Sequence, residues 1–594
     1  MGTNISRRQF LGLSGGVIGA AALAASGVKF DLPKNEREID PANMKVKEQE
    51  TDILVIGGGM AGLFAAVKGH DAGAKVTMVV KGRLGTSGQT PFAKGMFSYD
   101  PKSARMDLDE YLDQIAASAI NTNNRVFTKQ MVENSKARVD ELREWGFFDS
   151  ALCYDSFATP IYERDIPVVE RVMITHLIKE DGRIAGAAGF SYDDEKIHIF
   201  KAKSVVLCTG AGGFKPNGFP ICDLTHDGSV MAYKIGAKIT GKEWNDGHSG
   251  SMENPADCYN GWHGMFAMKP STTGMEIHHD LGVDMNYTAY VNGPPVQMGP
   301  GGEMAEGGPY VPEGFGMPAM KGGDDGPMGP PPGGDDNRQG PPPGGDDNRQ
   351  GPPPGGKDGG EGGGPGMNAN SSGGASAGLA IHKSEGIVPI NENCESTIPG
   401  LYAAGDALGS YMAGTIYTQV GSSLTGSAVQ GAIASEAAAA YCKKVSQKNI
   451  SNGRIKEIKE EILAPLNQDS GYSPAWVTQT LQSVIIPNFV LYIKKESLLK
   501  AALAYVEELR DHHTPMLKAA NLHELRLAHE TAHMIVNAEM KLKASLTRTE
   551  SRCSHYRLDY PEVDYDNWEA WLNIYRDENG EMQFEKQPFG SWPV

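Results

Sequence analysis

The sequence contains few cysteines for its length and no Cys-x-x-C pair. The seven cysteines in 594 residues lie singly, at Cys153, Cys208, Cys222, Cys258, Cys394, Cys442 and Cys553. This spacing argues against an iron–sulfur cluster or a structural zinc site of the usual type, and the odd number argues against a disulfide framework.

The sequence also lacks an excess of positive charge. Its 73 acidic residues outnumber its 55 lysines and arginines, which gives a net charge of −18 and a pI of about 5.4. Nucleic-acid binding requires clustered basic residues for phosphate contacts, so we expect no nucleic acid as a partner. The length is sufficient for several domains and a large core.

A long, strongly hydrophobic run is also missing from the N-terminus. The twin arginines Arg7 and Arg8 precede an uncharged stretch, Gly12 to Val28, that is rich in glycine and alanine. Residues 1–30 are typical of a twin-arginine export signal, which predicts the twin-arginine translocase as a partner and a periplasmic or extracytoplasmic location. A membrane anchor is the alternative, although the stretch is at the short limit for a span. Twin-arginine export carries proteins that fold around a cofactor first, so the signal agrees with a cofactor-binding protein.

Residues 317–366 lack the apolar side chains that a packed core requires. An eleven-residue Pro/Gly-rich unit stands at 329–339 and again at 340–350. Such a composition gives an extended, solvated chain, so we expect a disordered surface insertion. Glycine does not occur at every third position, which excludes collagen. A polyproline-binding partner is the alternative.

A glycine motif near the start of the chain predicts a dinucleotide site. The apolar run from Thr51 leads into Gly57, Gly59 and Gly62, which have G-x-G-x-x-G spacing. In this motif the first glycine makes a tight turn, the second lets the backbone approach a pyrophosphate, and the third lets helix and strand pack closely. A helix begins near Gly59, and its positive end favours phosphate. Residues 74–80 form the second strand of the unit.

The second strand ends at Val80, where an acidic residue usually holds the ribose of NAD. This weakens an NAD assignment. The fold class is α/β, with a Rossmann-like dinucleotide-binding domain in two parts (51–235 and 378–445). A capping, or substrate, domain (236–377) interrupts it, and a C-terminal helical domain with a tail (455–594) follows. Within these regions we expect a helix from about Thr425 to Tyr441 and helical structure throughout 475–547.

Several blocks in this order resemble the flavoprotein subunits of succinate dehydrogenase, fumarate reductase and adenylylsulfate reductase. Besides the glycine turn, they are a strand ending at Thr209-Gly210, a block around Asp227, a block ending at Asp406, and Arg548-Thr-Glu-Ser-Arg-Cys-Ser-His555. The resemblance implies FAD as the cofactor. It also implies an oxidoreductase that works with an iron–sulfur or cytochrome partner and a small-molecule electron acceptor or donor. The residues it assigns to FAD are Gly57, Gly59, Met60, Ala61, Gly62, Lys81, Gln89, Thr90, Gly95, Thr209, Gly210, Asp227, Asp406, Ser422, Ser423 and Leu424.

The resemblance also bears on how FAD is attached. Respiratory members of the family link FAD covalently to a histidine, and Gln89 stands at that position. Noncovalent FAD is therefore expected.

The substrate residues of the family are only partly present. His248 in Glu243-Trp-Asn-Asp-Gly-His248 resembles a substrate-facing histidine and is the predicted catalytic residue. The proton-donating arginine has no counterpart, because the only arginines between residues 244 and 380 are Arg338 and Arg349 in the repeats. The second histidine position falls at about Gly373 and the dicarboxylate arginine at Thr418. Two unpaired carboxylates are costly to desolvate, so fumarate and succinate are rejected as substrates.

Two rival functions remain open from the sequence. One is a non-catalytic flavin electron-transfer subunit. The other is a zinc metalloprotease, because His529-Glu-Thr-Ala-His533 matches H-E-x-x-H. Other polar candidates for a substrate pocket are Tyr259, His263, His278 and His279.

Overall fold

The computed structural model describes residues 41–86, 90, 96–102, 104, 107–147, 154–212, 214, 225, 227–244, 250–251, 371–372, 386–415, 422–485, 490, 493–553 and 555–592. The expected export signal (1–30) and Pro/Gly-rich insertion (317–366) lie outside these residues. In the described part of the chain, no helix is long and apolar enough to cross a membrane.

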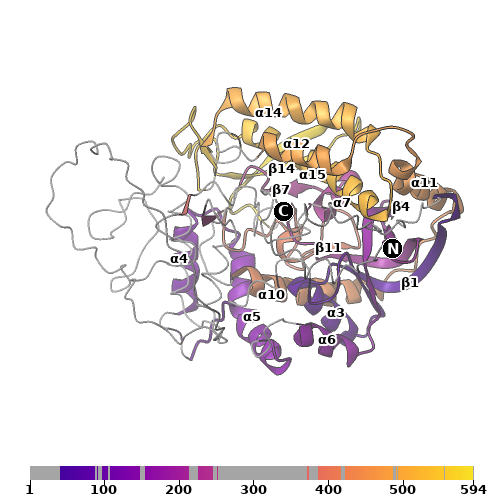
Figure 1. The fold of residues 1–594 in the computed structure, drawn as a ribbon. Helices are drawn as coiled ribbons and strands as arrows, with labels where there is room; N and C mark the ends of the chain where they lie inside the picture. Colours follow the sequence, from indigo (N-terminus) through magenta and orange to yellow (C-terminus); the bar gives the residue numbers. More distant parts are fainter. Residues whose placement is uncertain are drawn as a thin grey trace, which may run out of the picture.

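A seven-stranded sheet forms the centre of the molecule (Figure 1). Strand β1 (Lys45–Ile56) lies parallel to β2 (Val76–Val80) on one side and to β6 (Lys196–Leu207) on the other. Strand β3 (Val168–Glu170) extends the sheet beyond β2, and β11 (Leu401–Ala403) pairs in parallel with the end of β6. The carboxyl ends of these parallel strands therefore meet at one edge, where open α/β sheets bind ligands.

An antiparallel hairpin completes the sheet beyond β6. Its strands are β4 (Val172–Glu180) and β5 (Arg183–Ser191), and β5 pairs with the first half of β6. The second half of β6 pairs with β11 instead. Strand β6 thus joins residues far apart in the sequence, which the local pattern of any one segment does not specify.

Two glycine- and alanine-rich helices cover one face of the parallel strands. Helix α3 (Met60–Asp71) follows the glycine turn, and α10 (Ser422–Cys442) packs against it, as predicted for the alanine-rich segment but with an earlier start. A side chain at Gly431 would place its Cβ 2.3 Å from the carbonyl oxygen of Ala61, so small residues permit this close packing. Below them in Figure 1 lie the helices α5 (Arg125–Glu144) and α6 (Tyr154–Tyr162), and α4 (Leu108–Ser118) precedes α5.

The C-terminal region contains more than helices. Helices α11 (Asn452–Leu463), α12 (Pro474–Ile485), α14 (Glu496–Glu508) and α15 (Leu522–Thr547) are followed by strands β13 (Tyr556–Arg557), β14 (Ala570–Arg576) and β15 (Met582–Pro588). The expectation of helix throughout 475–547 was wrong at β12 (Ile493–Lys494), which pairs with β13. This pairing draws Lys494 into a buried site, so a long-range contact overrides the local helical period.

A second, four-stranded sheet combines strands from the C-terminal region with strands from the middle of the sequence. Strands β14 and β15 form a hairpin, and β14 also pairs with β7 (Ile239–Thr240), which pairs with β10 (Gly386–Ile387). Helix α7 (Asp227–Lys234) leads into β7, and α15 packs against α7. The C-terminal helices therefore reach the edge of the first sheet.

The remaining short elements are β8 (Gly250–Ser251), β9 (Ser371–Ser372), a π-helical turn (Leu509–His513) and 3₁₀ turns at Pro41–Asn43, Gly405–Ala407, Ala464–Asn467 and Thr514–Met516.

Candidate functional site

A cleft of about 1060 Å³, including the space that opens to solvent, lies at the carboxyl ends of β1, β2 and β6. The turn that forms its floor has a backbone that requires glycine. Gly57 has φ of +114°, and a Cβ there would lie 2.1 Å from the carbonyl oxygen of Cys208. A Cβ at Gly62 would lie 1.9 Å from the carbonyl oxygen of Gly57. The tight turn and the close packing predicted for these two glycines are both present in the structure.

The N-terminal ends of two helices face the cleft. At α3, Gly58, Gly59 and Met60 line the space, and the Met60 N–H donates to the Thr90 hydroxyl at 3.2 Å. At α10, Ser423 lines the cleft, and its hydroxyl donates to Asp406 at 3.2 Å. Helix N-termini carry partial positive charge and free N–H groups, so both ends favour a negatively charged ligand.

The lining of the cleft fits a pyrophosphate-linked dinucleotide. Gly57 and Gly59 line the cleft and carry no Cβ, so a ligand can approach the backbone of the turn closely. Among the described residues, the buried Thr209 hydroxyl in this wall has no hydrogen-bond partner. A buried polar group of this kind is normally satisfied, so a ligand that accepts or donates a hydrogen bond there suits the site.

A cluster of charged residues closes the cleft at the end of β2. Lys81 follows β2, and its Nζ lies 2.9 Å from Oδ2 of Asp227 and 2.9 Å from Oε1 of Glu530. The other oxygen of Asp227, Oδ1, accepts a hydrogen bond from Nδ1 of His533 at 2.7 Å. Lys81 and Asp227 line the cleft, whereas Glu530 and His533 come from α15 behind them.

The cluster holds Asp227 ionised and His533 neutral. Burial alone would raise the pKa of Asp227, but the charge of Lys81 and the hydrogen bond from His533 hold it well below its ordinary value. Burial lowers the pKa of His533 to about 4, and nearby Lys234 acts in the same direction. A neutral His533 that donates from Nδ1 leaves Asp227 as a permanent hydrogen-bond acceptor at neutral pH.

The low pKa of His533 predicts loss of stability in acid. An exposed histidine in the unfolded chain has a pKa of about 6.5, so between that pH and pH 4 the unfolded chain binds more protons than the folded one. The free energy of unfolding therefore falls as the pH decreases through this window.

We expect the free energy of unfolding of His533→Asn to fall less than that of the parent between pH 7 and pH 5, by about 1–2 kcal/mol. Urea unfolding at both pH values measures the difference. His512→Asn, at an exposed position, is the control, and an identical pH dependence in parent and His533→Asn would contradict the assignment.

The H-E-x-x-H side chains point to three separate partners. Nε2 of His529 lies 2.9 Å from the carbonyl oxygen of Ile462, while Glu530 contacts Lys81 and His533 contacts Asp227. The described residues contain no group of three or more histidine, cysteine or acidic side chains placed to hold a metal ion. In this fold Glu530 and His533 pack behind the cleft, where they contact two residues of its lining, and His529 contacts α11 instead.

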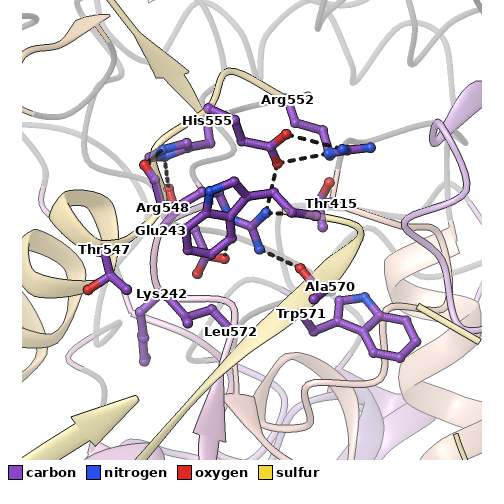
Figure 2. Close-up of polar contacts among 12 residues, drawn as sticks. Lys242, Glu243, Thr415, Thr547, Arg548, Arg552, His555, Ala570, Trp571 and Leu572 are labelled. Atoms are coloured by element: carbon purple, nitrogen blue, oxygen red, sulfur yellow. Dashed lines mark hydrogen bonds and ion pairs between the residues drawn. The ribbon is translucent and has the colours of Figure 1, made fainter. Parts of the chain in front are cut away.

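A second network of buried charges is centred on Arg548 (Figure 2). Its guanidinium donates to Glu243 at 3.0 Å and to Glu550 at 2.8 Å, and to the carbonyl oxygen of Ala570 at 2.6 Å. Glu550 also accepts from Arg552 at 2.8 Å and 3.1 Å. All three of Arg548, Glu243 and Glu550 are fully buried. The network fixes Glu243, which precedes the predicted catalytic segment.

Two further buried bases complete this network. Nζ of Lys494 donates to the carbonyl oxygen of Glu243 at 2.5 Å and lies 2.9 Å from Nδ1 of His555. Burial and neighbouring cations lower the pKa values of both Lys494 and His555. Nε2 of His555 lies 3.2 Å from the carbonyl oxygen of Arg548, so a neutral ring with hydrogen on Nε2 fits both contacts.

Most of the predicted FAD residues that the structure describes lie together. The glycine turn, Lys81, Thr90, Thr209, Gly210, Asp227, Asp406, Ser423 and Leu424 all line the cleft. Gly62 and Ser422 lie at its margin, where Gly62 packs beneath the turn and Ser422 begins α10. The predicted positions that lie outside the described residues are Gln89, Gly95, His248, Tyr259, His263, His278, His279, Gly373 and Thr418.

The sequence interpretation missed the part that α15 plays in the cleft. Glu530 and His533 stand some 300 residues after Asp227 in the chain, and their spacing was considered only for the alternative of a zinc site. A useful signal was present, since Val80 stands where an acidic residue is usual and a lysine follows it, and a buried lysine needs acidic neighbours.

Comparison with known proteins identifies the cofactor chemistry. Residues 52–158 match the FAD binding domain model, and residues 479–592 match the fumarate reductase flavoprotein C-terminal model. The chain is an FAD-dependent oxidoreductase. This flavoprotein is 25% identical over 585 residues to an uncharacterised FAD-dependent oxidoreductase of Methanocaldococcus jannaschii, covering 90% of this chain and 98% of that protein.

The fold of this flavoprotein matches that of solved redox enzymes. It superposes on the flavoprotein of Escherichia coli quinol fumarate reductase with a TM-score of 0.65 at 16% identity, covering 91% of this chain and 97% of that one. It superposes on adenylylsulfate reductase of Archaeoglobus fulgidus with a TM-score of 0.62 at 19% identity, covering 94% and 98%. These comparisons establish the mixed α/β fold with an FAD-binding domain and a C-terminal domain.

Proposed function

We propose that this flavoprotein binds FAD noncovalently and transfers electrons between FAD and a small substrate other than fumarate or succinate. When bound, FAD supplies two-electron hydride chemistry. The chain contributes the turn at Gly57 and the N-termini of α3 and α10, which suit the pyrophosphate and a negatively charged reduced flavin. Gln89 offers no nucleophile for the histidyl linkage, which supports noncovalent attachment.

The absence of two arginines from the sequence carries the substrate argument. Between residues 244 and 380 the only arginines are Arg338 and Arg349, in the Pro/Gly repeats, and Thr418 stands at the position of a dicarboxylate-binding arginine. Arginine binds carboxylates through paired, charge-assisted hydrogen bonds. Without both arginines a dicarboxylate would be desolvated at a cost of several kcal/mol. The same fold occurs in a fumarate reductase and in an adenylylsulfate reductase, so the fold does not require a dicarboxylate substrate.

His248 is the proposed catalytic residue. It follows Glu243 and Trp244, which the Arg548 network holds in place. An imidazole titrates near neutral pH, so His248 can act as proton donor or as a neutral hydrogen-bond partner of the substrate.

Electrons are proposed to come from a separate iron–sulfur or cytochrome protein. The chain has no Cys-x-x-C pair of its own, and one solved relative of the fold is a quinol fumarate reductase subunit. Export through the twin-arginine translocase to the periplasm or its equivalent is also proposed, from Arg7 and Arg8. Cell fractionation tests export, because a variant with both arginines changed to lysine should stay in the cytoplasm.

Anaerobic reoxidation of the reduced protein tests the substrate proposal. Acid precipitation should first release all flavin into the supernatant, as noncovalent binding requires. Enoates, quinones and sulfur oxyanions are then compared with fumarate. We expect fumarate to be slow and another acceptor to be much faster, with His248→Ala reducing the faster rate by about 10²-fold or more.

Three outcomes would contradict parts of this proposal. Fumarate turnover at about 1 per second or faster would overturn the substrate argument. An unaffected His248→Ala rate would remove His248 from catalysis. Failure of every small acceptor, together with fast oxidation by a redox protein, would favour the non-catalytic electron-transfer subunit.

A further inference from the structure

Helix α15 supplies residues that stand behind the dinucleotide cleft. Glu530 and His533 lie one turn apart on this helix, and both are buried, with exposed side-chain fractions of 7% and 2%. They touch Lys81 and Asp227, which are more exposed and line the cleft. The arrangement has two layers: two residues face the ligand, and two residues from another domain hold them.

The position of this cluster in the fold indicates the part of the ligand that it faces. Dinucleotide folds hold the ribose of the adenosine half at the end of the second strand, with an acidic residue that accepts from its hydroxyls. Here the second strand ends at Val80, and Lys81 comes next. The acidic group at this place is Asp227, from α7, which Lys81 contacts through Oδ2.

Asp227 can accept from a ribose only if its carboxylate is ionised and correctly turned. Oδ1 takes the hydrogen bond from His533, and Oδ2 takes those from Lys81 and from the Thr225 hydroxyl at 2.8 Å. These contacts fix the carboxylate plane and leave further lone pairs for a ligand. The hydrogen bond from His533 is the one that comes from outside the FAD-binding domain.

Glu530 has the matching role for Lys81. Its Oε1 lies 2.9 Å from Nζ of Lys81 and accepts from Arg526 at 3.1 Å. The two cations, Lys81 and Arg526, therefore contact the two carboxylates, and His533 stays neutral. Lys81, which is only 18% exposed, thus has two carboxylates within 2.9 Å of its ammonium group.

We propose that Glu530 and His533 are positioning residues for the adenosine ribose of FAD, acting through Lys81 and Asp227. FAD binding is thereby coupled to the docking of α15 against α7. The inference rests on FAD as the cofactor and is independent of the substrate.

FAD titration of the apoprotein, followed by quenching of flavin fluorescence, tests this inference. We expect His533→Leu to weaken FAD binding about tenfold or more, because Asp227 loses a charge-assisted hydrogen bond and its fixed orientation. His533→Asn keeps an N–H at the Nδ1 position and should stay within about threefold of the parent. Glu530→Gln should weaken binding by about threefold or more. His529→Leu, on the same helix but hydrogen-bonded to Ile462, is the matched control and should leave the FAD Kd unchanged.

Binding of an FAD analogue without the two adenosine ribose hydroxyls distinguishes the loss of ribose positioning from a general loss of structure in the variant. The parent should bind it more weakly than FAD, and His533→Leu should bind it about as well as the parent does. Equal loss for FAD and the analogue, or failure of His533→Asn to restore binding, would overturn the inference. If His533→Leu does not fold, as judged by circular dichroism, Glu530→Gln provides the same comparison. A parent that binds no FAD would instead refute the proposed function.

Discussion

Gly57→Ala is expected to weaken FAD binding about a hundredfold or more. The new Cβ would lie 2.1 Å from the carbonyl oxygen of Cys208 and 2.6 Å from its carbonyl carbon. Both are backbone atoms at the end of β6, so no side chain can move aside to make room. The φ of +114° adds backbone strain for any residue with a Cβ. The ends of β1 and β6 must therefore separate, and these ends carry the floor of the cleft.

Two other glycine variants make this result specific. Gly59→Ala meets only the Thr90 hydroxyl, at 3.3 Å, so the apoprotein should keep its melting temperature while FAD binding falls. Gly73→Ala has a φ of +86° but open space around its Cβ, and it lies in the turn after α3. We expect it to cost about 1 kcal/mol of stability and to leave the FAD Kd unchanged. Parental affinity in Gly57→Ala would mean that the close approach to Cys208 is not required for binding.

The glycine turn was predictable because its information is local. The strand before Gly57, the helix after Gly59 and the second strand up to Val80 are all encoded within some 30 residues. The strand, turn and helix each have a distinct sequence pattern, and all three agree. The α/β fold class followed from this unit and from the order of the later blocks.

The contacts made by the C-terminal region could not be predicted in the same way. Lys494 interrupts a helical period because β12 pairs with β13, and the partner strand lies some 60 residues away. Strand β14 pairs with Ile239–Thr240, more than 300 residues earlier. Such pairings depend on which surfaces meet in the folded chain, and the local pattern around each strand does not reveal its distant partner.

The H-E-x-x-H segment shows that a local motif does not determine the role of its residues when their partners are distant. The spacing of His529 and His533 suits a metal, since both fall on one side of a helix. In the structure, the neighbours of the helix decide the role. Asp227 and Lys81 stand opposite His533 and Glu530, and a carbonyl oxygen stands opposite His529. In this fold, two residues of the motif contact residues that line the cofactor cleft and do not form a zinc site among the described residues.

Arg548→Met is expected to lower the free energy of unfolding by about 3–5 kcal/mol. Arg548 is fully buried, its guanidinium pairs with Glu243 and Glu550, and it lies 4.6 Å from the ring of Trp244. Methionine restores much of the volume but leaves two buried carboxylates without their shared cation. A buried charge that loses its partner costs far more than the pair contributed. Urea unfolding, followed by tryptophan fluorescence, measures the loss.

Two comparisons separate the charge effect from general damage. Arg454→Met removes an exposed arginine that pairs with Glu457 at 3.1 Å, and such surface pairs contribute about 1 kcal/mol or less. Adding Glu243→Gln to Arg548→Met should recover part of the lost stability, because it removes one unpaired charge. Burial raises the pKa of Glu243, and Arg548 opposes that rise. If Arg548→Met cost less than about 1 kcal/mol, Glu243 would be protonated in the native protein. The buried network would then hold the segment before His248 by hydrogen bonds rather than by charge.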